Sequence, residues 1–243
     1  MRPDLATLAF MTRIANLSWD KIEPLLAAGA PAILPIGAGA KEHGLHLPMN
    51  TDEIQALWLA DKLAEKTGAL VWPTVTYGFY PAFTDFPGSI SLARATFVTL
   101  IREIVTGIKQ HGARQVFVLD TGISTIAPVS EAIARLESVT HLRIHAGPAY
   151  KAAADALREQ AFGSHADELE TSRMLVIAPE HVNMSRAAAT PHSPIEGPLT
   201  RANAPSGSYG DPTLATREKG ERLTAAMLDD LLAEMKDYMN RTA

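Results

Sequence analysis

The chain contains no cysteine, which excludes disulfide frameworks and metal sites built from thiolates. No apolar run reaches the roughly 18 residues that a membrane-spanning helix requires. Lysine and arginine form no dense run and the net charge is −5, which argues against nucleic acid or an anionic membrane as the main partner. The segment from Leu5 to Met11 is too short for a good signal peptide and is soon followed by Arg13, so we expect a cytoplasmic protein.

The 243 residues are 47% hydrophobic and 20% charged, a composition that suits one large domain with a full core. Strand-like and helical segments alternate along the chain, which predicts a single α/β domain with a mainly parallel sheet and helices on both faces. Residues 187–214 are rich in Pro, Gly, Ser and Asn and predict a long surface loop.

The periodicity of apolar residues gives approximate boundaries for these segments. Expected strands lie at 32–36, 69–75, 116–119 and 142–144. Expected helices lie at 19–28, 53–66, 94–111, 129–138, 151–159 and 217–240, with a further helical stretch that ends before Pro179. Ser18 is the expected N-cap of the first helix, and Asp52 or Thr51 that of the second.

The loop that leaves the first strand, from Pro35 to Asp52, concentrates polar side chains. Its imidazoles and carboxylates are Glu42, His43, His46 and Asp52. These are ligand types that Zn²⁺, Mn²⁺ or Fe²⁺ accept, and loops at strand ends are where open α/β sheets keep their sites. The alternative is a polar loop whose imidazoles bond to the backbone.

Three other segments carry candidate functional groups. The loop Asp120–Thr125 follows another buried strand and forms either a substrate-binding wall or a turn that caps the next helix. His165 lies three residues before Glu168, which suits a proton-transfer or ligand pair or merely a solvated helix start. The aromatic loop 77–89 suits a pocket wall or a subunit interface.

Four motifs follow one another between residues 34 and 220. They are Leu34-Pro35-Ile36-Gly37 with Glu42-His43-Gly44-Leu45-His46-Leu47-Pro48 and Thr51-Asp52; Phe86-Pro87-Gly88-Ser89-Ile90-Ser91-Leu92; His165-Ala166 with Glu170-Thr171-Ser172; and Gly210-Asp211-Pro212 with Ala215-Thr216 and Glu218-Lys219-Gly220. Together they resemble the creatininase (creatinine amidohydrolase) family. The resemblance implies a three-layer α/β/α domain, often assembled as a hexamer, in which two zinc, manganese or iron ions activate water to hydrolyse amides.

The resemblance also assigns roles. His43 matches the family's histidine ligand, Asp52 matches the aspartate that bridges the ions, and His165 and Glu170 are the expected catalytic residues. The family's glutamate ligand position holds Lys41, and Glu42 is one residue away. At the second loop, Gly122 and Ser124 replace a histidine and a glutamate ligand.

Both ions therefore lose a ligand, and we expect one ion, either zinc, manganese or iron, on Glu42, His43 and Asp52. A site without metal stays open, with Lys41 in place of a cation. His46, Asp120 and Ser124 are the expected substrate-binding residues.

The expected function is hydrolysis of a C–N bond in a small molecule by a homo-oligomer. Creatinine is a poor candidate, because residues 146–165 contain no tryptophan of the kind that creatinine enzymes place around their substrate. Two alternatives remain: a metal-free enzyme that uses Lys41, Glu42 and His43 directly, and a small-molecule-binding protein without catalysis.

Overall fold

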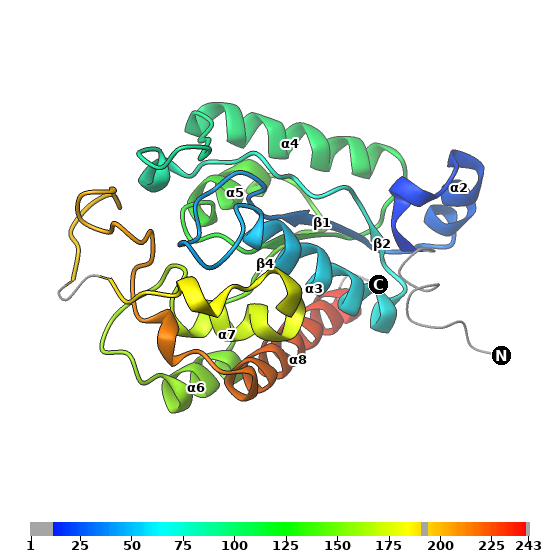
Figure 1. Ribbon diagram of the computed structural model, residues 1–243. Coiled ribbons are helices and arrows are strands. Elements are labelled where there is room, and N and C mark those ends of the chain that lie inside the picture. Colours follow the sequence, from blue (N-terminus) through cyan, green and yellow to red (C-terminus); the bar gives the residue numbers. More distant parts are fainter. Residues whose placement is uncertain (1–11, 191–193, 242–243) are drawn as a thin grey trace.

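The computed structural model describes residues 12–190 and 194–241, so the N-terminal segment from Leu5 to Met11 lies outside the described residues. Its strands form one parallel sheet in the spatial order β2-β1-β3-β4. Their bounds are β1 Ala32–Ile36, β2 Leu70–Val71, β3 Val116–Asp120 and β4 Val139–Arg143. Helices cover both faces of this sheet (Figure 1), which confirms the predicted α/β class.

Successive side chains along a strand point alternately into two hydrophobic cores, one on each face of the sheet. In β1, Ile33 packs into one core while Leu34 and Ile36 pack into the other, as the twofold periodicity of a strand requires. The first core is closed by α3 (Thr51–Thr67), α6 (Pro148–Leu157), α7 (Glu168–Ile177) and α8 (Arg217–Arg241). The second is closed by α2 (Trp19–Ala27), α4 (Arg94–Gln110) and α5 (Ile126–Ile133). Together these make three layers, helix on sheet on helix.

The register of the strands aligns their carboxyl ends. Ile36 pairs with Asp120, and Asp120 pairs with Arg143, so the three loops that follow β1, β3 and β4 leave from one edge of the sheet. That edge is where ligands bind in open α/β sheets. The fold thus brings together loops that are far apart in the sequence.

Most element boundaries agree approximately with the sequence, and some differ, such as the strand expected at 142–144, which is Val139–Arg143. The strand expected at 69–75 is only Leu70–Val71, because Pro73 has no N–H to donate; a single bridge from Val75 to Ile36 resumes the pairing. The helix expected at 151–159 begins earlier, with Pro148 in its first turn. The helix expected at 129–138 is Ile126–Ile133.

The helix caps were predicted less well. Ser18 occupies the N-cap position of α2, as expected, but its side chain accepts no hydrogen bond from the helix backbone. The second cap was wrong, because α3 starts at Thr51 with Asn50 at the N-cap position, which leaves the Asp52 carboxylate free for other partners.

The described part of the 187–214 segment, residues 187–190 and 194–214, contains no α-helix or β-strand, and some of it is buried. Its hydrophobic residues pack against Phe83 and Phe86 of the aromatic loop 77–89. Ala204 and Ser208 are fully buried. The short 3₁₀ turns of the molecule are η1 Ile14–Asn16, η2 Pro81–Phe83, η3 Pro179–His181, η4 Met184–Arg186 and η5 Pro212–Leu214.

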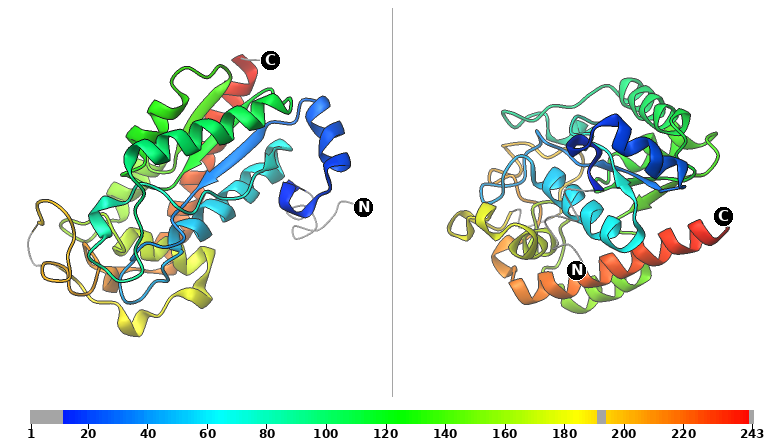
Figure 2. Two further views of the ribbon diagram at one scale, coloured as in Figure 1. Left: turned by 90° about the horizontal axis from the view of Figure 1, so that it is seen from above. Right: turned by 90° about the vertical axis from the view of Figure 1, so that its right-hand side faces the viewer.

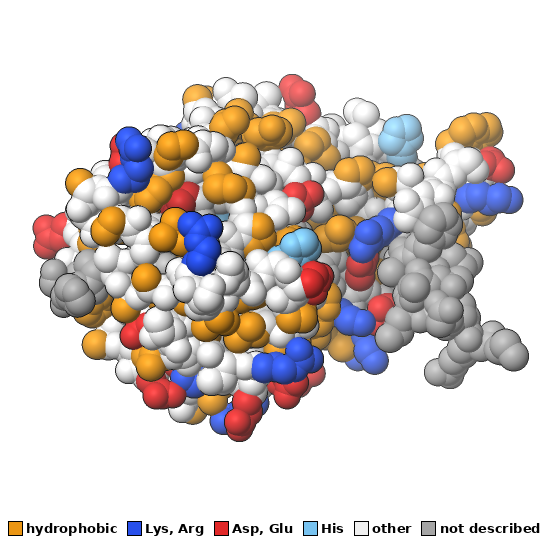
Figure 3. Space-filling model, viewed as in Figure 1, with side chains coloured by type: hydrophobic (Ala, Val, Ile, Leu, Met, Phe, Trp, Pro, Cys, Tyr) orange, Lys and Arg blue, Asp and Glu red, His pale blue; other side chains and the backbone are white. Residues whose placement is uncertain are grey.

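Figure 2 places α2 and residues 194–214 at opposite ends of the molecule. No helix within residues 12–190 and 194–241 is long and apolar enough to cross a membrane. The face shown in Figure 3 intersperses acidic, basic and hydrophobic side chains without a broad area of one charge.

Candidate active site

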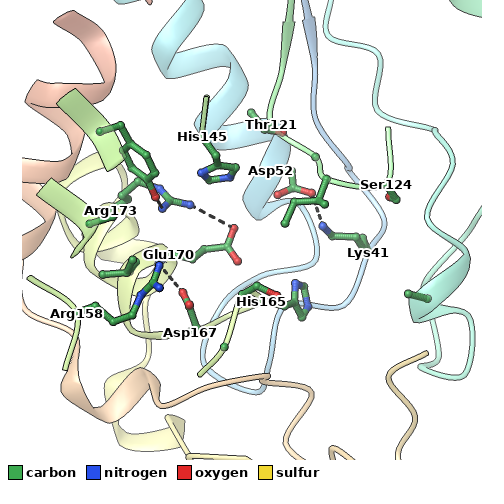
Figure 4. Close-up of a pocket in the computed structure, with 18 of the residues that line it drawn as sticks. Lys41, Asp52, Thr121, Ser124, His145, Arg158, His165, Asp167, Glu170 and Arg173 are labelled. Atoms are coloured by element: carbon green, nitrogen blue, oxygen red, sulfur yellow. Dashed lines mark hydrogen bonds and ion pairs between the residues drawn. The ribbon is translucent and has the colours of Figure 1, made fainter. Parts of the chain in front are cut away.

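A cavity of about 600 Å³ opens at the carboxyl edge of the sheet. Figure 4 shows that side chains from the loops after β1 and β3, from α3 and from α7 converge on it. The residues that line it include Lys41, Asp52, Phe83, Thr121, Ser124, His145, Tyr150, His165, Asp167, Glu170 and Arg173. A cavity of this size accommodates a small molecule.

An ion pair forms one wall of the cavity. Nζ of Lys41 lies 2.6 Å from Oδ2 of Asp52, and both side chains are buried. Nε2 of His43 lies 3.1 Å from the other carboxylate oxygen. Burial alone would raise the pKa of Asp52, but the ammonium group of Lys41 and the imidazole of His43 beside it dominate and hold that pKa well below its usual range.

The imidazole of His43 has a defined tautomer. Its Nδ1 lies 2.9 Å from the backbone oxygen of Lys41, which can only accept, so Nδ1 carries the proton in the neutral ring. Its Nε2 is buried and makes no hydrogen bond to any described residue, because the approach of Asp52 lacks hydrogen-bond geometry. A buried acceptor nitrogen without a donor is unusual in a folded protein.

His165 is held by Glu42. Its Nε2 lies 3.2 Å from Oε2 of Glu42, and its ring contacts that of Phe83 at a centroid distance of 4.3 Å with the two planes tilted by 46°. The other oxygen of Glu42 accepts the N–H of Gly44. Glu42 is therefore fixed on both oxygens, and it orients His165 rather than facing Asp52.

The residue after His165 has a strained backbone. Ala166 adopts a φ of 45°, in the left-handed region that residues other than glycine rarely adopt. Its N–H donates to Oε2 of Glu170 at 2.8 Å. Glu170 thus stabilises the turn that directs His165 into the cavity.

Glu170 lies at the centre of a buried polar network. Its Oε1 accepts from Nε2 of Gln55 at 3.1 Å, and Arg173 donates to the same Gln55 at 3.0 Å and to the hydroxyl of Tyr150 at 2.8 Å. Burial alone would raise the pKa of Glu170, but the neighbouring side chains of His43, His165 and Arg173 lower it to about 2. The carboxylate is charged at neutral pH.

The expected substrate-binding residues occupy three different surroundings. Ser124 lines the cavity and donates to the backbone oxygen of Phe79 at 2.8 Å. Asp120 accepts from Thr125 at 2.7 Å and pairs with His141 at 3.0 Å, and it borders a smaller cavity of about 180 Å³. His46 is buried beside Thr171, 2.8 Å away, and does not line the main cavity.

The expected metal ligands are not gathered as a set. Within the described ranges, the group that places potential ligand atoms within 4.8 Å of one another is His43, His165 and Glu170, all buried. Of the sequence-predicted set, only His43 belongs to it. Glu42 is turned to His165, and Asp52 is paired with Lys41.

Three functional candidates were missed from the sequence. His145 follows β4, Tyr150 lies in α6, and Arg173 lies one helical turn after Glu170; all three line the cavity. Burial, with Arg173 nearby, lowers the pKa of His145 to about 3. The position of His145 just after a strand, at the same edge as Asp120, is a pattern that predicts it.

A parallel α/β fold with a cavity of imidazoles and carboxylates at its strand ends is an enzyme architecture. The Creatininase family model, described as creatinine amidohydrolase, matches residues 15–235. The chain therefore belongs to the creatininase family, as its motifs indicated.

Curated relatives include several hydrolases. Creatinine amidohydrolase of Pseudomonas putida is 27% identical over 86% of this chain and 90% of its own length. A 3-dehydro-scyllo-inosose hydrolase of Thermotoga maritima is 26% identical over 86% of this chain and 78% of its own. A mycofactocin precursor peptide peptidase of Mycolicibacterium smegmatis is 29% identical over 85% of this chain and 84% of its own.

Solved creatininase structures share the fold. A mutant creatininase with alanine in place of a tryptophan matches with a TM-score of 0.81 and 26% identity, covering 93% of this chain and 98% of that one. A structure described as creatininase Mn gives a TM-score of 0.80 at 25% identity, over 93% and 98% of the two chains. Another, described as a Zn-Zn type, gives 0.79 at 25% identity, over 93% and 97%.

Proposed function

We propose that the protein hydrolyses a C–N bond, of the linear or cyclic amide type, in a small molecule bound in the main cavity. The observation that carries this proposal is the convergence of His165, Glu170, Asp52 and Lys41 on one cavity of about 600 Å³. Family membership and relatives named as an amidohydrolase, a hydrolase and a peptidase support it. The residues that line the cavity include no tryptophan, which supports a substrate other than creatinine.

His165 is the proposed general base. Hydrolysis requires a group that takes a proton from water as its oxygen attacks the carbonyl carbon, and that returns a proton to the departing nitrogen. The imidazole of His165 faces the cavity, and the bond to Glu42 fixes its orientation. Glu170 holds the backbone turn beneath it, so its role is to position His165.

A single divalent ion fits a subset of these residues. His43 and His165 each direct one ring nitrogen at an oxygen, of Lys41 and Glu42 respectively, which leaves the other nitrogen as an acceptor. With the charged Glu170 they form a two-imidazole, one-carboxylate set, the ligand chemistry of zinc and manganese. The unpartnered Nε2 of His43 supports the fit. A bound ion would supply a Lewis acid for water or the carbonyl.

Two ions fit poorly. A second ion would need Asp52, but the ammonium group of Lys41 lies 2.6 Å from that carboxylate and neutralises it. The second loop offers Gly122 and Ser124, neither of which replaces an imidazole or a carboxylate. We therefore propose one ion at most, held by His43, His165 and Glu170. Its binding would occupy the lone pair that His165 needs as a base, so the base role of His165 belongs to the protein without the ion. Assembly into a homo-oligomer stays a prediction from the family resemblance.

A panel of linear and cyclic amides tests the function. Protein purified without a histidine tag is incubated with each amide, and the released amine and carboxylate are detected by mass spectrometry. We expect turnover of at least one amide and a fall in kcat of about 10²–10⁴ in H165A. H181A, at an exposed histidine, is the control. Failure of every amide, or an unchanged kcat in H165A, rejects the proposal, and a ligand that binds without turnover favours a binding protein.

A further inference from the structure

Lys41 is an unusual residue for a cavity wall. It is buried, and its ammonium group lies between the Asp52 carboxylate and the faces of two aromatic rings, 4.9 Å from the centroid of Phe83 and 5.6 Å from that of Tyr80. Removing an ammonium group from water is costly even when it is paired. A buried lysine in an open cavity therefore calls for an explanation beyond packing.

The ammonium group has donors to spare. It carries three N–H groups, and the partner that the described residues provide for it is Asp52. The aromatic faces of Phe83 and Tyr80 attract the charge without accepting a directed hydrogen bond. Lys41 also lines the cavity, where Figure 4 shows His165 and Glu170 near it. An oxygen atom of a bound molecule is the partner that this arrangement lacks.

The other cationic side chains that line the cavity do not combine burial with free N–H donors. Arg173 is already bound to Gln55 and Tyr150. Lys151 and Arg158, both on the α6 side, are exposed to solvent. Lys41 alone among these four lining residues combines burial with uncommitted donors, and in a cavity of low dielectric its charge acts strongly.

We propose that Nζ of Lys41 binds the carbonyl oxygen of the scissile amide and stabilises the negative charge that develops on it. This rests on the proposed hydrolysis and names the electrophilic group of that site. Water adds its oxygen to the carbonyl carbon and gives a proton to His165, while the electron pair of the C=O bond moves onto the oxygen held by Lys41. When that pair returns, the C–N bond breaks and the nitrogen takes the proton from His165, leaving a carboxylic acid and an amine.

The position of Asp52 completes this assignment. Its carboxylate holds the ammonium group at the wall through the ion pair, so that the charge of Lys41 is in position before a substrate arrives. Groups that are oriented in advance toward the developing charge give the largest catalytic effects. In this arrangement Asp52 is a positioning residue for Lys41.

Acetate, the simplest carboxylate product, is a suitable probe. Its affinity is measured by isothermal titration calorimetry, with the protein as purified and again after dialysis against chelator, so that acetate held by an ion is recognised. Since K41M strands a buried carboxylate, the informative comparison is D52N against K41M/D52N, which differ only in the lysine. We expect the affinity for acetate to fall about tenfold or more in K41M/D52N relative to D52N, and to change by less than about twofold in K21M, at an exposed lysine outside the cavity. Equal affinities in D52N and K41M/D52N overturn the proposal.

Chemical restoration separates charge from folding. The chain has no cysteine, so K41C carries the only thiol, and 2-bromoethylamine converts it to a side chain of lysine length with an ammonium group. Iodoacetamide gives a neutral control. With both products equally folded by circular dichroism, the aminoethylated one should regain acetate binding and kcat, and the neutral one should remain about 10²–10³-fold below wild type in kcat. Equal kcat values in the two products reject the catalytic role.

The two proposals fail in different ways. If wild type releases no amine from any amide but its acetate binding depends on Lys41, the hydrolysis is wrong and the oxyanion site stands. If amides are hydrolysed and the neutral K41C product retains full kcat, the hydrolysis stands and the role of Lys41 is wrong.

Discussion

Oε2 of Glu42 lies 3.2 Å from Nε2 of His165, and the two side chains form a buried carboxylate–imidazole pair, of which His165 lines the cavity. The residues are 123 positions apart in the sequence. The pair assigns Glu42 to orienting the proposed base, where the sequence had suggested a metal ligand. It also gives Glu42 a role in the site although it lies one residue away from the family's glutamate ligand position.

The substitution E42Q tests this orienting role. It preserves the size of the side chain but removes the charge that holds the His165 tautomer. We expect kcat to fall by about 10–100-fold with little change in thermal stability. Steady-state kinetics on an amide that wild type hydrolyses measures this, with E180Q at an exposed glutamate as the control. A kcat equal to that of wild type shows that Glu42 is dispensable.

The metal content distinguishes two ligand sets. The structure favours His43, His165 and Glu170, so protein purified without a tag should bind about one zinc or manganese ion. In E170Q we expect the affinity for the metal ion to fall by about 100-fold or more, because the substitution removes a charged ligand. Elemental analysis and titration of the metal-depleted protein provide the measurement.

The control for the metal experiment is H181A, which should bind as wild type does. A protein that binds no ion, or one in which D52N weakens binding more than E170Q does, contradicts the proposed set. The second outcome favours the ligands expected from the sequence, Glu42, His43 and Asp52. The first leaves a metal-free site that relies on Lys41.

The sequence predicts the class of fold well and the site only in part. Apolar runs and alternating segments identify β1, β3 and α4, because buried strands and amphipathic helices leave a local pattern. Local pattern also places His43, Asp52, His165 and Glu170 near strand ends or helix starts. It does not show which carboxylate faces which imidazole, because that depends on loop geometry.

Two residues illustrate the limit. Glu42 and Asp52 are both acidic members of one loop segment, yet one pairs with His165 and the other with Lys41 and His43. Arg173 belongs to a helix whose weak amphipathic pattern gives no reason to select it, and its partners Gln55 and Tyr150 come from α3 and α6. Such long-range pairs exist only after the helices pack.

His46 should make stability depend on pH. Burial lowers its pKa from 6.5 to about 4, so between these values the unfolded chain binds a proton that the folded chain does not. Stability from this group is therefore complete above pH 6.5 and is lost as the pH falls toward 4. We expect this contribution to be on the order of 2 kcal/mol, after allowance for partial solvent screening.

Urea unfolding of wild type and H46Q between pH 7.5 and pH 4.5 measures the effect. H46Q lacks the titrating ring, so its unfolding free energy should fall less steeply over that range, even if it starts lower because the contact with Thr171 changes. H181Q, at an exposed histidine, should follow wild type. Parallel curves for wild type and H46Q refute the assignment.

Two glycines in helices provide a matched test of how α7 is held in place. A Cβ atom at Gly220 of α8 would lie 1.9 Å from the backbone oxygen of Ser172 in α7, whereas one at Gly107 of α4 would meet nothing within 4 Å. Alanine favours a helix over glycine by roughly 1 kcal/mol. The same substitution should therefore stabilise at one position and destabilise at the other.

We expect G107A to raise the free energy of unfolding by about 0.5–1 kcal/mol. We expect G220A to lower it by about 2 kcal/mol, because α8 must move away from α7 to relieve the overlap. Since Ser172 lies two residues after Glu170, that movement should also disturb the support of His165 and reduce kcat in G220A but not in G107A. Urea unfolding and steady-state kinetics measure both effects, and a G220A protein as stable and active as wild type would show that the close approach of α7 and α8 is not required.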